Sequence, residues 1–163
     1  MTFTVRGIPQ HVADEVRRTR LAPGYGHPAH HEIARGTGPC RCCLRTFVPG
    51  VDERLLFTYR PGGDDSSLMA PGPVFIHADS CAAYAGEGFP PGLRDLPLAF
   101  EARAADSRVL GLSRAAGARA EPEIVRLLDD GDAGWLHLRH AEAGCFIARV
   151  DRAARRSSHS FGQ

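Results

Sequence analysis

All five cysteines of this chain lie in three short stretches, and their spacing points to metal or thiol chemistry. The first stretch holds a Cys-x-x-Cys pair, Cys40 and Cys43, and the second holds a His-x-x-x-Cys pair, His77 and Cys81. Both spacings allow two soft ligands to meet at one ion, and together the pairs would complete the tetrahedral shell that zinc prefers. We therefore predict a zinc-like site formed by these four residues.

The same residues also allow metal-free interpretations. Free cysteines are often small buried hydrophobic side chains, so Cys40, Cys43 and Cys81 could simply belong to the core. Cys40 and Cys43 could instead cycle between a dithiol and a disulfide, with flanking arginines favouring the thiolate. Thioredoxin-like enzymes place that motif after a strand, whereas here a Gly/Pro-rich loop precedes it. Cys42, between the two cysteines of the pair, has no assigned role.

Cys145 and His137 form a second group that could do chemistry. They lie on two expected strands of a short hairpin, where a Cys-His pair could serve nucleophilic catalysis. Either residue could also replace a missing metal ligand. The alternative for His137 is a half-buried sheet residue whose ring is hydrogen-bonded to the backbone. The histidines of the 27–31 segment lie in a loop, where solvent exposure is the simpler interpretation.

Every basic residue is arginine, since the 20 Lys and Arg positions include no lysine. A GC-rich coding bias explains this, but Arg45, Arg60 and Arg149 fall in the same segments as the cysteines. Several guanidinium groups in one pocket would bind a carboxylate or phosphate in a bidentate manner. Ion pairs on a solvated face are the alternative. Our second hypothesis is thus a metal-free enzyme or binding domain with an anionic small-molecule ligand and a reactive thiol at Cys40 or Cys145.

Composition narrows the possible partners. The chain has 163 residues, 43% of them hydrophobic and 24% charged, which is typical of one globular domain. A net charge of +1 gives no strong attraction to polyanions, so we expect neither a nucleic-acid nor a membrane partner. The first twenty residues lack the apolar core of a signal peptide, and no apolar run is long enough to span a bilayer. We expect a cytoplasmic protein with reduced thiols.

The pattern of apolar residues predicts more strand than helix. A Gly/Pro/His-rich stretch at 22–39 is expected to be a loop, because its glycines and prolines interrupt regular structure. Strands are expected at 3–7, 54–60, 73–78, 97–105, 108–113, 135–140 and 145–150, and helices at 10–20 and from 121 onward. This order predicts an α+β fold, with a mostly antiparallel sheet and one or two packed helices in a single domain at 1–151. Residues 152–163 are expected to be a flexible tail.

Three blocks of the sequence are also similar to those of a known family. They are Gly38-Pro39-Cys40-Arg41-Cys42-Cys43-Leu44-Arg45, Gly72-Pro73-Val74-Phe75-Ile76-His77 with Cys81, and Gly144-Cys145-Phe146-Ile147-Ala148-Arg149-Val150. In this order they resemble a bacterial family catalogued as domain of unknown function 1203, over about residues 3–151. The resemblance implies a compact single-domain protein and matches the family's Pro-Cys-Arg-x-Cys-Leu block at Cys40 and Cys43. Cys42 is then the variable position of that block.

Overall fold

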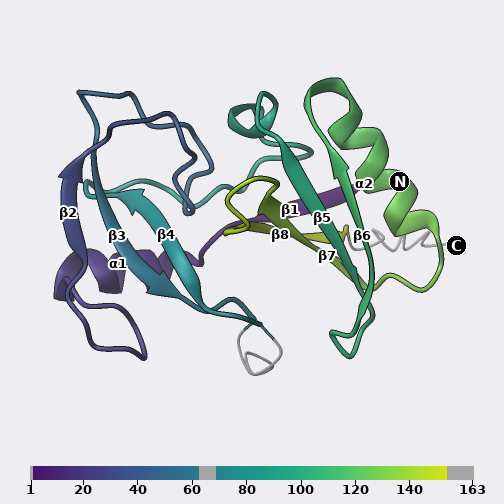
Figure 1. The fold of residues 1–163 in the computed structure, drawn as a ribbon, viewed down its shortest axis with the longest axis horizontal. Coiled ribbons are helices and arrows are strands. Elements are labelled where there is room, and N and C mark those ends of the chain that lie inside the picture. Colours follow the sequence, from purple (N-terminus) through teal and green to yellow (C-terminus); the bar gives the residue numbers. More distant parts are fainter. Residues whose placement is uncertain (1, 63–68, 154–163) are drawn as a thin grey trace, which may run out of the picture.

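The computed structural model of the chain describes residues 2–62 and 69–153, and these contain two α-helices and eight β-strands in two antiparallel sheets (Figure 1). The expected α+β class is confirmed. The elements are β1 (Phe3–Arg6), α1 (Gln10–Thr19), β2 (His30–Ile33), β3 (Glu53–Tyr59), β4 (Gly72–His77), β5 (Leu98–Arg103), β6 (Val109–Ala115), α2 (Ala120–Asp129), β7 (Trp135–His140) and β8 (Phe146–Arg152). Most of the tail expected at 152–163 lies outside the described residues. Neither helix in the described ranges has the length and apolar character needed to cross a bilayer.

The larger sheet has the strand order β1-β8-β7-β5-β6, and helix α2 covers one of its faces (Figure 1). Alternation along β7 turns Leu136 and Leu138 toward that helix. Ile124 and Leu128 of α2 are fully buried against them, so this face and the helix enclose one hydrophobic core. Pro122 stands in the first turn of α2, where its missing N–H costs no hydrogen bond.

The opposite face of the same sheet carries polar side chains, several of them buried. Strand pairing places Arg149, His137 and Glu101 in one row, and Asp151, Trp135 and Arg103 in the next row. We call this surface the polar face; it consists of Arg6, Glu101, Arg103, Trp135, His137, Arg139, Arg149 and Asp151.

The smaller sheet, β2-β3-β4, packs with α1 around a second core. Leu55, Phe57, Val74 and Ile76 point inward from β3 and β4, as their alternation predicts. Val16 of α1 is fully buried against this core. Four cysteines belong to the same core: Cys40, Cys42, Cys43 and Cys81.

The expected loop at 22–39 is wrong in part, because His30–Ile33 form strand β2. Its backbone pairs with β3 from His30 opposite Leu56 to Ile33 opposite Glu53. The side chains of β2 are mostly exposed, so the strand has little apolar pattern of its own. Pairing with the edge of β3 creates this strand, and local composition does not reveal it.

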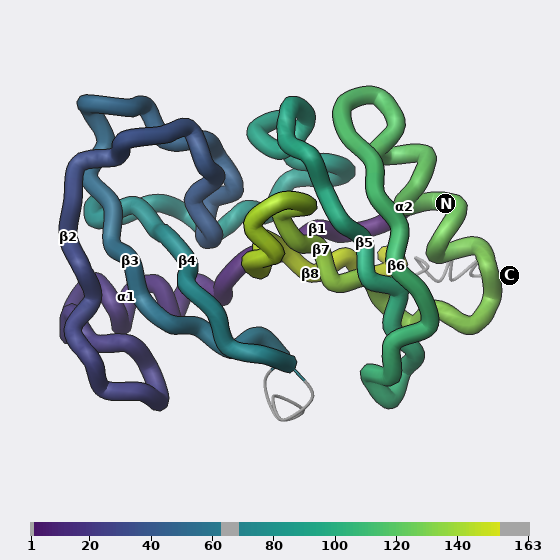
Figure 2. The backbone as a smooth tube through the Cα atoms, in the orientation of Figure 1, coloured from purple at the N-terminus to yellow at the C-terminus, as the bar shows by residue number. Residues whose placement is uncertain are grey.

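Hydrogen bonds from the segment around Arg41 connect the two sheets. Figure 2 shows the course of the backbone between them. The backbone N–H of Ile8, between β1 and α1, donates to the carbonyl of Arg41 at 2.7 Å. The buried Arg41 side chain reaches the β7–β8 connection, where Nε donates to the carbonyl of Phe146 at 2.6 Å and Nη2 donates to Cys145 Sγ at 3.0 Å. Nη1 donates to the carbonyl of Pro39 at 2.6 Å. One short segment therefore holds both parts of the fold together.

A glycine is required where β1 leads into this contact. A Cβ atom at Gly7 would lie 2.0 Å from the carbonyl oxygen of Arg41, so the two backbones could not keep their spacing. We expect Gly7→Ala to lower the free energy of unfolding by about 1–3 kcal/mol, as overpacking does. Denaturant unfolding measures this. Gly36→Ala is the matched control, since its Cβ would meet no atom within 4 Å. Equal stability of the two variants would contradict the tight contact.

Candidate metal centre

Cys40 and Cys43 lie in a tight turn of a short hairpin. A bridge between Pro39 and Thr46 closes its base. Within the turn, the N–H of Leu44 donates to the carbonyl of Cys40, and the N–H of Cys40 donates to the carbonyl of Arg45, both at 2.8 Å. Leu44 adopts a left-handed conformation with φ of 60°, which costs energy for a residue with a branched side chain. The surrounding contacts hold this turn in a conformation that brings both thiols to one point.

His77 and Cys81 come from the end of β4 and the segment after it. The N–H of Arg41 donates to the carbonyl of Phe75 at 2.9 Å, which places the hairpin turn alongside β4. The N–H of His77 then lies 3.3 Å from Cys40 Sγ. Beyond β4, the side chain of Gln10 holds the chain, because its Nε2 donates to the carbonyl of Cys81 at 3.1 Å. A rigid strand end and a helix start thus position the second pair.

The four predicted ligands meet in the structure. One side-chain ligand atom from each of Cys40, Cys43, His77 and Cys81 lies within 4.8 Å of all the others. The Sγ atoms of Cys40 and Cys81 are 3.8 Å apart, and Cys43 Sγ is 3.5 Å from His77 Nδ1. Tetrahedral zinc, with Zn–S near 2.3 Å and Zn–N near 2.05 Å, requires separations of about 3.8 Å and about 3.6 Å. The residues therefore fit a tetrahedral ion without rearrangement of these two pairs.

A carboxylate orients the histidine. His77 Nε2 lies 3.4 Å from Asp52 Oδ2, which also accepts the N–H of Val48 at 2.7 Å. The bond from Val48, followed by the interaction with His77, holds the pKa of Asp52 below its usual value. Hydrogen bonding to Cys40 raises the pKa of His77 to about 9, so a metal ion must displace a proton from the ring. An ionised Asp52 favours keeping the proton on Nε2, which leaves Nδ1 to bind the ion. Metal-binding histidines commonly have such a carboxylate partner.

The surroundings shift the pKa values of Cys40 and Cys43 in opposite directions. Hydrogen bonds with Cys40 and Cys81, together with contacts to Arg45, lower the pKa of Cys43. The bonds with Cys43 and Cys81 and the burial of its side chain raise the pKa of Cys40. Arg17 donates from Nη2 to Cys81 Sγ at 2.9 Å and supplies a positive charge beside the cluster. Three thiols that share protons in this way are a donor set that a metal cation deprotonates.

The remaining predicted residues lie outside this cluster. Cys42 is fully buried, and its Sγ lies 4.0 Å from the carbonyl of Cys81. Cys145 Sγ accepts a hydrogen bond from Arg41. His137 is only 5% exposed, and its Nδ1 has no hydrogen-bond partner among the described residues. The expectation of a half-buried His137 satisfied by backbone is therefore wrong. The residue lies between β5 and β8 in the middle of the sheet, and the ring of Phe146 is 5.3 Å from its own ring.

The three predicted anion-binding arginines do not line one cavity. Arg149 lines a cavity of about 500 Å³ beside the polar face, and Arg45 lines a separate one of about 430 Å³ next to Cys43. Arg60 lines neither. Arg6 shares the cavity of Arg149. Sequence reasoning missed Arg6, although its place on strand β1 opposite Arg149 explains the proximity.

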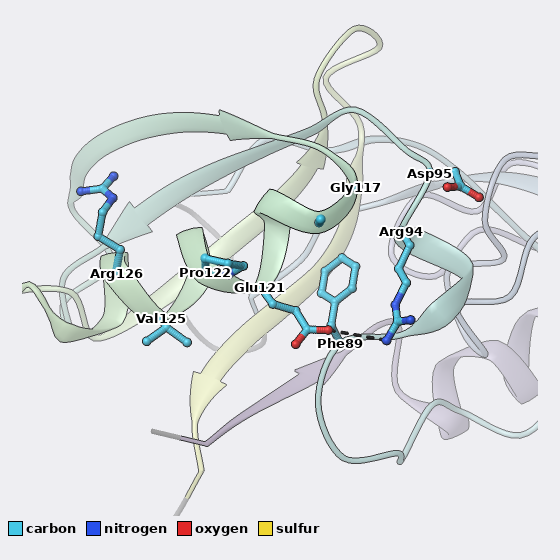
Figure 3. A pocket seen from close by; sticks show the side chains of 9 residues that line it. Phe89, Arg94, Asp95, Gly117, Glu121, Pro122, Val125 and Arg126 are labelled. Atoms are coloured by element: carbon cyan, nitrogen blue, oxygen red, sulfur yellow. Dashed lines mark ion pairs between the residues drawn. The ribbon is translucent and has the colours of Figure 1, made fainter.

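A surface cavity of about 940 Å³ lies at α2 (Figure 3). Arg94 and Glu121 face each other across it at 3.7 Å, and both side chains are at least half exposed. This ion pair is exposed to solvent, so it gives the cavity no fixed charge for a ligand.

Comparison with known proteins identifies the family. Residues 37–152 match the family model described as "Protein of unknown function (DUF1203)". The chain therefore belongs to the DUF1203 family. The matched region contains all four residues of the cluster. Neither curated proteins nor solved structures gave a match to this chain.

Burial of His137 predicts a dependence of stability on pH. Burial, followed by the charges of Arg139 and Arg103, lowers the pKa of His137 to about 3. The unfolded chain binds a proton near pH 6.5 and the folded chain does not, so acid favours unfolding between pH 6.5 and about 3. Relative to His137→Gln, the wild type should lose up to about 1.4 kcal/mol of unfolding free energy per pH unit below 6.5.

Denaturant unfolding of both proteins at pH 7 and pH 5 measures this difference. Acid effects on other groups are common to the two proteins and cancel in the comparison. Parallel pH dependences would show that His137 is not buried in the neutral form.

Proposed function

We propose that this protein binds one Zn²⁺ through Cys40, Cys43, His77 and Cys81, and that the ion has a structural role. The observation that carries the proposal is the convergence of four ligand atoms within 4.8 Å, from two segments far apart in the sequence. Two of the separations are within about 0.1 Å of those of a tetrahedral zinc shell. The proposal thus rests on a defined set of donor atoms, three thiols and one imidazole.

The donor set favours zinc among biological metals. Three thiolates and one imidazole form a soft, tetrahedral shell, which is the usual Cys₃His arrangement of structural zinc. With three thiolates the filled site carries a charge of −1, and Arg17 beside Cys81 balances it. Thiols that must remain reduced fit a reducing compartment, so we also propose a cytoplasmic location.

Three features favour a structural role over a catalytic one. The protein supplies all four ligands, so no position of a tetrahedral ion remains for water or substrate. Cys40 is fully buried, and Cys43 and Cys81 are 5% and 8% exposed. The ligands also join the turn that carries Arg41 to the end of β4, and Arg41 in turn contacts β8. Zinc would therefore hold the connection between the two sheets.

Metal content tests the proposal directly. The purified chain should contain about one zinc per molecule by elemental analysis. Cys43→Ser should remove this zinc, because a hydroxyl is a poor replacement for a thiolate ligand. Cys42→Ser is the matched control: its side chain is also buried and lies next to the ligands, but outside the cluster.

Unchanged zinc in Cys43→Ser, or loss of zinc in Cys42→Ser alone, would contradict the ligand assignment. Should Cys43→Ser fail to fold, removal of metal from the wild type by a chelator provides a second readout. Its thermal unfolding midpoint should fall on chelation and recover when Zn²⁺ is added back.

The carboxylate behind His77 supplies a further test. Asp52→Asn should weaken zinc affinity about 10–100-fold, because an amide neither stabilises the imidazole as a ligand nor fixes its tautomer as an ionised carboxylate does. Competition with a zinc-binding dye measures the affinity. Asp106→Asn, in the exposed β5–β6 turn, is the control and should leave it unchanged. Equal affinities of both variants would exclude Asp52 from supporting the site.

A further inference from the structure

The cavity beside the polar face has the construction of a ligand site. Its volume of about 500 Å³ is within the range of small-molecule pockets. Arg6, Trp135, His137 and Arg149 of the larger sheet form one side. Tyr59 from the end of β3 contributes to the lining as well. The cavity therefore lies where the two sheets meet.

The charges of the polar face are unbalanced in a way that favours an anion. Asp151 pairs with both Arg6 and Arg149, at 3.2 and 3.0 Å. One carboxylate thus faces two guanidinium groups, which leaves one positive charge at the mouth of the cavity. Among the described residues, Arg149 bonds Asp151 through Nε and Nη2, so its Nη1 is available to a ligand.

A second carboxylate of the polar face also pairs with two arginines. Glu101 pairs with Arg103 and with Arg139, the latter at 2.5 Å. The side chains of Glu101 and Arg103 are only 8% and 10% exposed. Buried ion networks contribute little net stability, because desolvation offsets their attraction. This network therefore adds a second excess of positive charge to the polar face, although its residues do not line the cavity.

The aromatic side chains of the cavity supply an apolar surface. The rings of Tyr59 and Phe146 are 5.6 Å apart, and the ring of His137 is 5.3 Å from Phe146. The guanidinium carbon of Arg149 lies 4.2 Å from the centre of the Trp135 ring, which holds this cation in place at the cavity wall. A flat ring can pack among these groups while its substituent reaches the arginine.

His137 is an unexplained polar group within this lining. Its Nδ1 is buried without a hydrogen-bond partner among the residues described, although such groups usually find one. The residue as a whole is only 5% exposed. A buried polar group without a partner is unusual in a folded protein and needs an explanation, such as a functional role.

We propose that this cavity binds a small aromatic carboxylate, with its ring among Tyr59, Trp135 and Phe146 and its carboxylate on Arg149 and Arg6. This assignment is independent of the metal centre, since none of the four cluster residues lines the cavity. The carboxylate shares the two guanidinium groups with Asp151 and supplies the missing negative charge. Charge-assisted, bidentate contacts then decide which ligands bind.

The chain contains one tryptophan, Trp135, so its fluorescence reports directly on this cavity. The probes are benzoate, phenylacetate and 3-phenylpropionate, each compared with its neutral amide, and cyclohexanecarboxylate as the non-aromatic acid. At least one aromatic acid should change Trp135 fluorescence and bind about tenfold or more tightly than its amide, because bonds to an ionised group are about twice as strong. Failure of all three acids to bind at millimolar concentration would overturn the proposal, and so would equal affinity for acid and amide.

Variants locate the binding site. By isothermal titration calorimetry, Arg149→Gln should weaken binding of the best acid about tenfold, and Arg6→Gln should weaken it in the same direction. Arg108→Gln, on the exposed β5–β6 turn, is the matched control and should bind as the wild type does. Thermal unfolding midpoints verify that each variant is folded; Arg6 is 67% exposed, so its variant should tolerate the change. Wild-type affinity in both Arg6→Gln and Arg149→Gln would place the ligand elsewhere and refute the assignment.

Discussion

The meeting of three thiols and one imidazole at the end of β4 is the contact on which the arrangement of this molecule depends. The hairpin turn that carries two of the thiols also carries Arg41, whose backbone binds Ile8 and Phe75 and whose side chain binds Phe146. The conformation of this turn therefore determines both the position of the thiols and the contact between the two sheets. A buried guanidinium in such a position needs a fixed backbone, and four ligands on one ion would provide it.

Much of the fold follows from patterns that are local in the sequence. Alternation at 98–115 and 135–152 identifies two hairpins of the larger sheet, and Pro122 marks the start of α2. Strand β2 could not be predicted in this way, since His30–Ile33 are mostly exposed and gain their conformation from pairing with β3. Pairing between distant segments is decided by tertiary contacts.

In the candidate site, too, some residues can be predicted from local sequence and others depend on tertiary contacts. Ligand spacing singles out the cluster residues because two donors three or four positions apart can reach one ion. Asp52 and Arg17 carry no such signal, for their roles arise when β3 and α1 pack beside the cluster. The burial of His137 is likewise a property of three neighbouring strands. Arg149 could be chosen from its segment, whereas its partnership with Arg6 requires the register of β1 and β8.

The coordination of the proposed zinc ion tests the central claim most directly. X-ray absorption at the zinc edge of the purified protein should give a first shell of three sulfur atoms at about 2.3 Å and one nitrogen at about 2.0–2.1 Å. That result would identify the Cys₃His donor set formed by Cys40, Cys43, His77 and Cys81. A shell of oxygen and nitrogen atoms alone, or one with fewer than three sulfur atoms, would contradict it.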